Sequence, residues 1–125
     1  MKVKPTNSEL EILQILWRKG DSTVREVNEE LSAEKKIEVG YTTTLKLMQI
    51  MTEKGLVNRD TSSRTHIYSA AFTHENTSKG ILDSMIETVF NGSAAQLVMQ
   101  ALSTKKSSKE EIEMIKKYLD QLDKK

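Results

Sequence analysis

The 125-residue sequence contains no cysteine, a single proline, two histidines and five glycines. Without cysteine the chain cannot form a disulfide framework, hold a metal through thiolates or attack a substrate with a thiol. The glycines are isolated from one another, which excludes a glycine-rich phosphate-binding loop. No apolar run approaches the ~20 residues that span a bilayer, and the N-terminal residues lack the apolar core of a signal peptide. We therefore expect a cytoplasmic protein.

Residues suited to catalysis are also scarce. No aspartate or glutamate stands at metal-ligand spacing from His66 or His74, and no nucleophile motif lies near a histidine and an aspartate. The acidic pairs at 29–30 and 110–111 fit solvated helix surfaces better than a catalytic site. The sequence therefore predicts no enzyme, no metal, no cofactor and no small-molecule substrate.

The balance of charge gives no general attraction to a polyanion. The formal net charge is only +1, although charged residues make up 30% of the chain and hydrophobic residues 37%. These fractions are typical of a soluble, helix-rich protein. Any surface that binds nucleic acid must therefore be local.

The first predicted helix begins with a capping box, made either by Thr6 with Glu9 or by Ser8 with Glu11. It ends at the first glycine of the chain. We interpret its tryptophan as a core residue, because aliphatic neighbours argue against an exposed platform for stacking bases. The apolar face comprises Leu10, Leu13, Ile15, Leu16 and Trp17.

The second predicted helix begins at a capping box formed by Thr23 and Glu26. A polar connection over residues 32–39 follows it, which is longer than the turn of the tightest helix-turn-helix. The inward-facing residues are Val24, Val27 and Leu31.

The segment between Gly40 and Gly55 predicts a third helix. A wheel at about 100° per residue separates its side chains into two sets. Leu45 lies at the border between the sets, where it either packs or contacts a thymine methyl group. The inner set is Thr44, Leu47, Met48 and Met51, and the outer set is Thr42, Thr43, Lys46, Gln49 and Glu53.

The threonine run at 42–44 has two interpretations. Its hydroxyls can satisfy free N–H groups at the start of the helix, or they can contact phosphates and bases. The two roles are compatible, and we expect both for Thr42 and Thr43, with Thr44 turned toward the core.

A short β-hairpin is predicted next, with strands at 56–60 and 64–69 and a turn at 61–63. One face of the second strand can pack on the helices. His66 alternates out of the hairpin, where it either contacts a phosphate or is simply exposed. Three helices followed by a hairpin is the element order of a winged helix.

An arginine lies in each predicted arm of the hairpin, beside a helix whose outer side carries hydroxyls and a lysine. Such side chains suit phosphate oxygens and base edges. The sequence therefore predicts a DNA-binding winged-helix domain over residues 1–72. Its predicted DNA face consists of Thr42, Thr43, Lys46, Gln49, Arg59 and Arg64.

Three further helices are predicted after residue 72, beginning at Thr73 or Asn76, at Ser93 and at Ser108. The last of them carries an apolar seam with spacings of two heptads. Packing within one chain is one way to cover these helices, and a second copy is the alternative that we favour. Residues 73–125 are thus a predicted dimerisation domain with Ile81, Leu82, Met85, Val89, Phe90, Leu97, Leu102, Ile112, Ile115, Leu119 and Leu122 at the interface.

Five short motifs in this order resemble the penicillinase repressor family of bacterial transcriptional regulators. The motifs are Glu-Leu-Glu-Ile-Leu-Gln-Ile-Leu-Trp at 9–17, Thr-Val-Arg-Glu-Val at 23–27, Gly-Tyr-Thr-Thr-Thr at 40–44, Lys-Gly-Leu-Val at 54–57 and Phe-Asn-Gly-Ser at 90–93. The resemblance implies a homodimer that binds palindromic operators with TACA/TGTA-like elements. It also places the recognition residues of the family on the predicted DNA face.

Two departures from the family pattern concern induction. Members induced by β-lactams are cut at an Asn-Phe bond by a membrane sensor-protease, which the resemblance makes a candidate partner. Gln100-Ala101 replaces that pair in this chain. Copper-responsive members use C-terminal cysteines, and their mechanism is excluded here.

The resulting hypothesis is a dimeric winged-helix repressor that leaves its operator when dimerisation is lost. The alternative is a winged-helix module that binds another protein instead of DNA. A binding affinity that falls steeply as the salt concentration rises distinguishes DNA binding from that alternative.

Overall fold

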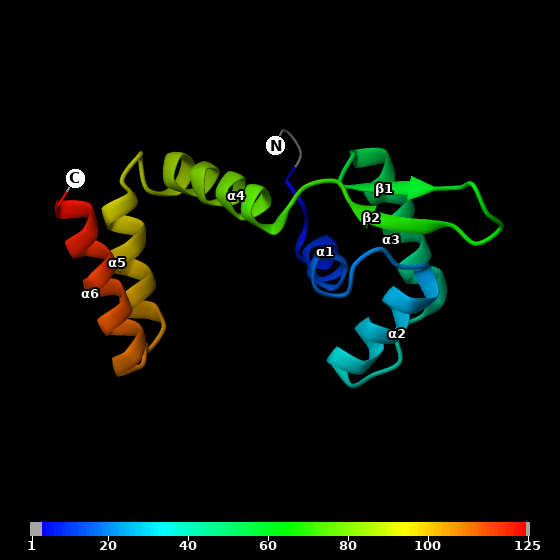
Figure 1. Cartoon of the computed structure of the whole chain (residues 1–125), viewed down its shortest axis with the longest axis horizontal. Coiled ribbons are helices and arrows are strands. Elements are labelled where there is room, and N and C mark those ends of the chain that lie inside the picture. Colours follow the sequence, from blue (N-terminus) through cyan, green and yellow to red (C-terminus); the bar gives the residue numbers. More distant parts are fainter. Residues whose placement is uncertain (1–3, 125) are drawn as a thin grey trace. The chain divides into compact units, whose positions relative to one another are not determined.

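The computed structural model describes residues 4–124, which form six helices and one two-stranded antiparallel hairpin (Figure 1). The predicted fold class, mostly α with a small hairpin, is confirmed. The chain divides into two compact units, the first ending at Ile81 and the second beginning at Leu82. The elements are α1 (Asn7–Lys19), α2 (Val24–Lys35), α3 (Tyr41–Lys54), β1 (Val57–Asp60), β2 (Ile67–Ala70), α4 (His74–Val89), α5 (Ala94–Thr104) and α6 (Lys109–Asp123).

Local side-chain chemistry sets the ends of the first two helices. At α1 the hydroxyl of Thr6 accepts from the backbone N–H of Glu9 at 3.2 Å, and the Glu9 carboxylate accepts from the N–H of Thr6 at 2.8 Å. The structure thus uses the first of the two predicted caps. The predicted capping box of Thr23 and Glu26 is confirmed at α2.

Helix α3 lies between Gly40 and Gly55, as predicted, and Gly55 ends it in the left-handed conformation with φ of 78°. The capping role predicted for Thr42 and Thr43 is wrong. Gly40 holds the cap position and has no side chain, and within residues 4–124 neither threonine hydroxyl makes a hydrogen bond at this end. Both threonines already have helical conformation, whereas a capping hydroxyl is carried by the residue before the helix.

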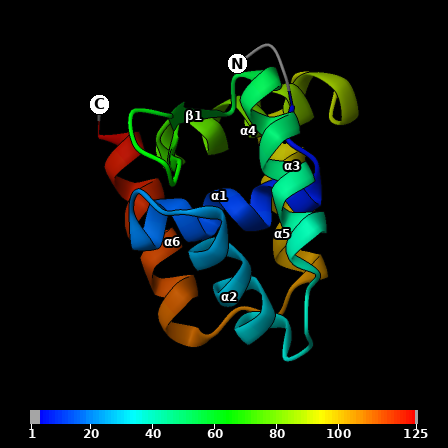
Figure 2. The ribbon, with the colours of Figure 1, turned by 90° about the vertical axis from the view of Figure 1, so that its right-hand side faces the viewer.

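Helices α1, α2 and α3 contact one another, and the hairpin contacts α1 and α3 (Figure 2). Ile12 is fully buried although the predicted apolar face omitted it. Trp17 packs at the edge of the core, and its Nε1 donates to the carbonyl of Phe72 at 2.9 Å. The buried apolar residues are Ile12, Leu13, Ile15, Leu16, Val24, Val27, Leu31, Met48, Met51, Leu56, Val57 and Tyr68.

The second strand of the hairpin is shorter than predicted. The Asp60 carboxylate accepts from the N–H of Ser62 at 2.9 Å, and the Ser63 hydroxyl donates to the carbonyl of Thr65 at 2.9 Å. These local bonds turn the backbone away from the ladder, so that residues 61–66 form a loop. Tyr68 lies on the packing face of the hairpin and is buried.

The start of α4 belongs to the first unit. Thr73, the first of the two predicted caps, accepts from the N–H of Asn76 at 3.0 Å. Thr77 is buried, and the ring of His74 stands edge-on to Trp17 with 5.0 Å between the ring centroids. The functional boundary predicted after residue 72 therefore stays a prediction, because the helix that follows it packs on the first unit.

The second unit begins within α4 and continues through α5 and α6. Ser93 caps α5, and Ser108 forms a capping box with Glu111 at α6. No described residue of α5 or α6 is buried, although both helices carry apolar side chains. Within residues 4–124 no helix combines the length and apolar composition needed to cross a bilayer.

A buried ion pair joins the start of α1 to the end of α3. The Glu9 side chain is 2% exposed, and its oxygens accept from Lys54 Nζ at 2.8 and 3.0 Å. Burial acts to raise the pKa of Glu9, but the hydrogen bonds from Lys54 and Thr6 outweigh it, and the pKa lies below its ordinary value.

We predict that Glu9→Gln lowers the free energy of unfolding by about 1–3 kcal/mol at neutral pH, because Lys54 loses its buried partner. The folded pKa is lower than the unfolded one. The stabilisation is therefore present above about pH 4 and is lost as the pH falls through the folded pKa. Urea unfolding measures the free energy of unfolding at each pH. Between neutral and acidic pH this free energy should fall less steeply for the variant than for the wild type.

The matched control is Glu11→Gln, which removes an exposed pair with Lys35 at 3.3 Å. This substitution should lower the free energy of unfolding by less than about 1 kcal/mol. If both substitutions lower the free energy of unfolding equally at neutral pH, the buried pair makes no special contribution and the prediction is wrong.

Candidate nucleic-acid interface

The polar face of α3 is positioned by the packing of its opposite side. Thr44, Met48 and Met51 are fully buried. Asn28 of α2 donates to the carbonyl of Val39 at 2.8 Å and to the hydroxyl of Thr44 at 3.0 Å. These contacts hold the start of α3, and the ion pair between Lys54 and Glu9 holds its end.

The outer set predicted for α3 is exposed: Thr42, Thr43, Lys46, Gln49 and Glu53. The sorting of this helix by the wheel is therefore confirmed, while the contacts of these residues with DNA stay a prediction. Leu45 is half-buried against the core, so its packing role is confirmed.

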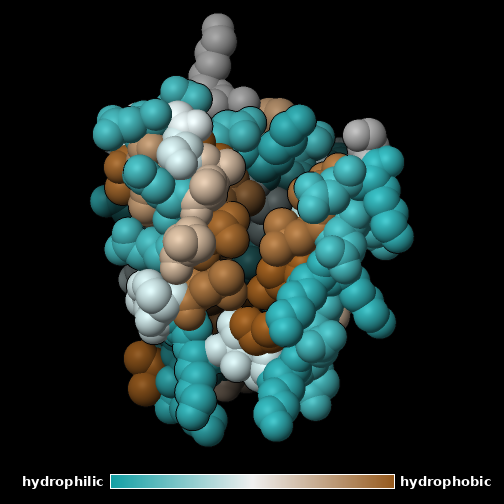
Figure 3. Space-filling view, turned by 90° about the vertical axis from the view of Figure 1, so that its left-hand side faces the viewer, coloured by the Kyte–Doolittle hydropathy of each residue, from teal (hydrophilic) through white to brown (hydrophobic). Residues whose placement is uncertain are grey.

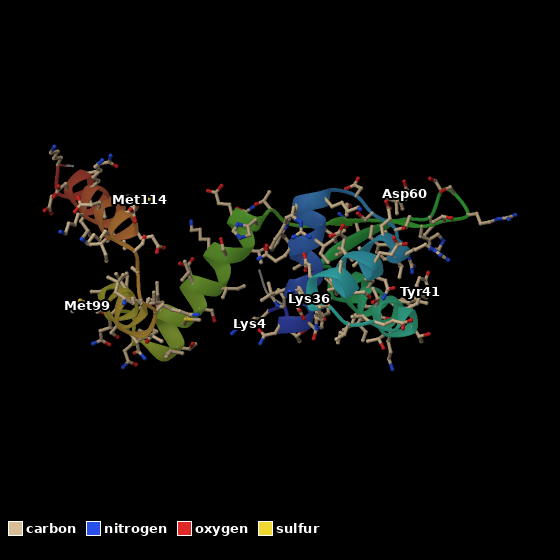
Figure 4. All side chains as sticks on the ribbon, turned by 90° about the horizontal axis from the view of Figure 1, so that it is seen from below. Lys4, Lys36, Tyr41, Asp60, Met99 and Met114 are labelled. Atoms are coloured by element: carbon tan, nitrogen blue, oxygen red, sulfur yellow. The ribbon has the colours of Figure 1, made fainter. Side chains whose placement is uncertain are left out.

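The two predicted arginines lie in the wing, which we define as β1, the loop 61–66 and β2. Arg59 is exposed on β1, where it pairs with Tyr68 across the ladder. Arg64 was expected on the second strand and instead lies in the loop, together with exposed His66. Because the loop lies outside the hydrogen-bonded ladder, Arg64 lies beyond the end of both strands. In Figure 4, Tyr41 marks the start of α3 and Asp60 the end of β1, where this loop begins.

A hollow of about 530 Å³ lies between the starts of α2 and α3 and the wing. Of the predicted DNA face, only Arg64 lines it. Arg25 and Tyr41 also line it, although neither belongs to the predicted DNA face. In the sequence both lie in the first turn of a predicted helix and within one of the five short motifs. The hollow is lined by Thr23, Val24, Arg25, Tyr41, Leu45, Arg64, Thr65, His66 and Tyr68.

Some basic residues of the first unit are paired with carboxylates, whereas others are not. Arg18, Lys19, Lys35 and Lys54 are paired with carboxylates of α1 or α2. Within residues 4–124 no ion pair involves Lys46, Arg59 or Arg64. Their positive charge is therefore available to an anionic partner, in spite of the small net charge of the chain.

The carboxylates of Asp60 and Glu26 accept from backbone amides, whereas the exposed Glu53 on the outer side of α3 forms no ion pair within residues 4–124. The pKa of Asp60 is lowered by the N–H of Ser62, and that of Glu26 by the N–H and hydroxyl of Thr23. Both groups therefore stay ionised at neutral pH, with their charge directed at these donors. Among the described residues, no group of three or more histidine, aspartate or glutamate side chains converges to hold a metal.

The predicted dimerisation residues line the helices of the second unit and the preceding turns of α4. A single chain leaves six of them exposed: Leu82, Met85, Val89, Leu102, Leu119 and Leu122. The other five are half-buried: Ile81, Phe90, Leu97, Ile112 and Ile115.

Further apolar side chains widen this surface beyond the predicted seam. Met99 of α5 is 71% exposed and Met114 of α6 is 69% exposed (Figure 4). Val98 and Tyr118 are exposed as well. Figure 3 shows hydrophobic side chains gathered in a band beside hydrophilic ridges. The heptad pattern, which only the last helix carries, missed Met114 and Tyr118 because they flank its two main positions.

The sequence matches the family described as penicillinase repressor over residues 5–121, which is nearly the whole chain. The chain belongs to the penicillinase repressor family. Comparison with curated proteins gave no match.

Two solved structures are similar to this penicillinase repressor family member. RosR of H. salinarum superposes with a TM-score of 0.54 at 17% identity, covering 94% of this chain and 92% of that chain. A MarR family protein from Bacillus stearothermophilus gives a TM-score of 0.48 at 24% identity, covering 98% and 75%. Family membership and the winged helix together identify a DNA-binding transcription regulator.

Proposed function

We propose that this penicillinase repressor family protein is a homodimeric repressor that binds a palindromic operator. Thr42, Thr43, Lys46 and Gln49 of each copy contact the major groove, and the wing places Arg59 and Arg64 against the backbone. The observation that carries the proposal is the exposed, polar outer side of α3 beside wing arginines that have no carboxylate partner among residues 4–124.

The dimer is supported by the surface of the second unit. Helices that carry aliphatic side chains without a core of their own leave an apolar surface that a soluble monomer rarely tolerates. A second copy covers this surface with the same residues, as a two-fold interface requires. A hollow lined by Val89, Phe90 and Met99, among others, lies between the end of α4 and α5 and offers room for partner side chains.

Dimerisation would supply much of the operator affinity. Once one winged helix is bound, its tethered partner meets the second half-site at high effective concentration. Loss of the interface should therefore release the operator. The Gln100-Ala101 bond lies inside α5, so a protease that needs an extended substrate must first unwind this helix.

Variants of the predicted DNA face test the contacts. Lys46→Ala and Arg64→Ala should each weaken duplex binding about five- to tenfold at moderate salt without lowering the melting temperature, because both side chains are exposed. Thr43→Ala should instead reduce the discrimination between operator and random duplex. Fluorescence anisotropy measures the affinity and the discrimination, with one duplex from the region upstream of the protein's own gene and one of random sequence.

The control is Lys36→Ala, which removes an exposed charge from the connection between α2 and α3. Unchanged affinity for Lys46→Ala and Arg64→Ala would overturn the assignment of this face. Binding that does not weaken with salt would favour a protein partner instead of DNA.

A variant of the apolar seam tests the role of dimerisation. Leu119→Glu places a carboxylate where two copies are proposed to meet, and burying it there is costly. The full-length variant should be a monomer by light scattering and should bind the operator about 100-fold more weakly. Lys117→Glu changes the charge at an exposed position of the same helix and should remain dimeric. A monomeric variant with wild-type operator affinity would contradict the mechanism.

A further inference from the structure

The hollow beside α3 is built from three segments that are distant in the sequence. Ser22 and Tyr68 exchange two backbone hydrogen bonds of 3.0 and 2.8 Å, which fix the start of α2 against β2. Val24 and Tyr68 form the buried part of the hollow, whereas Arg25, Tyr41 and Arg64 are exposed at its rim. The rim therefore carries two guanidinium groups and a phenol from α2, α3 and the wing.

Helix stability does not account for Arg25. The residue lies in the first turn of α2, where the helix dipole presents its positive end and disfavours a cation. Within residues 4–124 no ion pair offsets this cost, and the adjacent Glu26 carboxylate accepts from the N–H of Thr23 at 2.9 Å. An anion in the hollow would instead be favoured by both the guanidinium and the helix start.

No aspartate or glutamate lines the hollow. Guanidinium groups bind phosphate oxygens through paired hydrogen bonds, and a phenol donates a further one. The apolar side of Leu45 and Val24 suits the carbon face of a deoxyribose. Together these groups match the repeating chemistry of a nucleic-acid strand, in which a charged phosphate alternates with an apolar sugar face.

We propose that the hollow seats the sugar-phosphate backbone of one DNA strand, with Arg25 and Tyr41 as phosphate contacts outside the predicted DNA face. The proposal rests on the proposed function, which it extends from α3 and the wing to the start of α2. These contacts hold the strand that passes between α3 and the wing, and they fix the angle at which α3 enters the groove. Because these contacts are made with sugar and phosphate, they contribute equally to the binding of every DNA sequence.

The experiment uses the full-length protein and its variants Arg25→Ala, Arg25→Lys and Tyr41→Phe. The probes are labelled duplexes of equal length, one from the region upstream of the protein's own gene and one of random sequence. Arg25→Ala should weaken binding to both duplexes about tenfold and reduce the slope of log K against log salt by about 0.9. Arg25→Lys should keep the slope and recover part of the affinity, and Tyr41→Phe should lose about threefold.

Two controls separate a DNA contact from a structural role. Lys36→Ala removes an exposed charge that does not line the hollow and should leave the slope for the random duplex unchanged. The melting temperature of Arg25→Ala should equal or exceed that of the wild type, because a cation leaves the helix start. A lowered melting temperature together with affinity restored at low temperature would overturn the proposal.

The outcomes also separate this proposal from the proposed function. Wild-type protein that binds neither duplex in a salt-dependent manner overturns the proposed function. Wild-type binding with an Arg25→Ala variant indistinguishable from Lys36→Ala overturns only the contact in the hollow. Inorganic phosphate tests whether the hollow binds a free anion instead of a DNA strand. If it raises the melting temperature through Arg25 while DNA affinity is independent of Arg25, the hollow is a free-anion site and the proposal is wrong.

Discussion

The burial of one side of α3 is the constraint on which the rest of the structure depends. Thr44, Met48 and Met51 are fully covered, so the helix cannot rotate without exposing them. Asn28 fixes the start of the helix through two hydrogen bonds, and the Glu9 carboxylate fixes its end. Because one side is held at both ends, the opposite side presents a constant set of polar groups, and a fixed set is what discrimination between base pairs requires.

The distribution of charge follows from the same arrangement. Arg18, Lys19 and Lys35 of α1 and α2 pair with carboxylates of the same two helices. The lysine of the outer α3 face and the wing arginines have no such partner within residues 4–124. A chain with a net charge of +1 can thus leave these three basic side chains available to an anionic partner. The affinity of one copy for DNA should be modest, which makes the second copy important.

The sequence predicted the features that depend on neighbouring residues. Helix α3 lies between Gly40 and Gly55 because these residues act locally, and the capping boxes follow from side chains three residues apart. The sequence misplaced Arg64, since a loop built by side-chain hydrogen bonds shortens the second strand. It missed Arg25 and Tyr41 as a pair, because only tertiary packing brings their helix starts together beside the wing. The apolar surface of the C-terminal helices was visible as periodicity, but its full width depends on which side chains the single chain leaves uncovered.

Two copies of the α3–wing surface are proposed to bind one DNA molecule together. The decisive experiment is hydroxyl-radical footprinting of the full-length protein on the region upstream of its own gene. Two bound copies should protect two half-sites related by a two-fold axis and separated by about one helical turn, ~10 bp, or a near multiple of it. A single protected segment without a symmetry mate, at protein concentrations where the dimer prevails, would contradict the proposal.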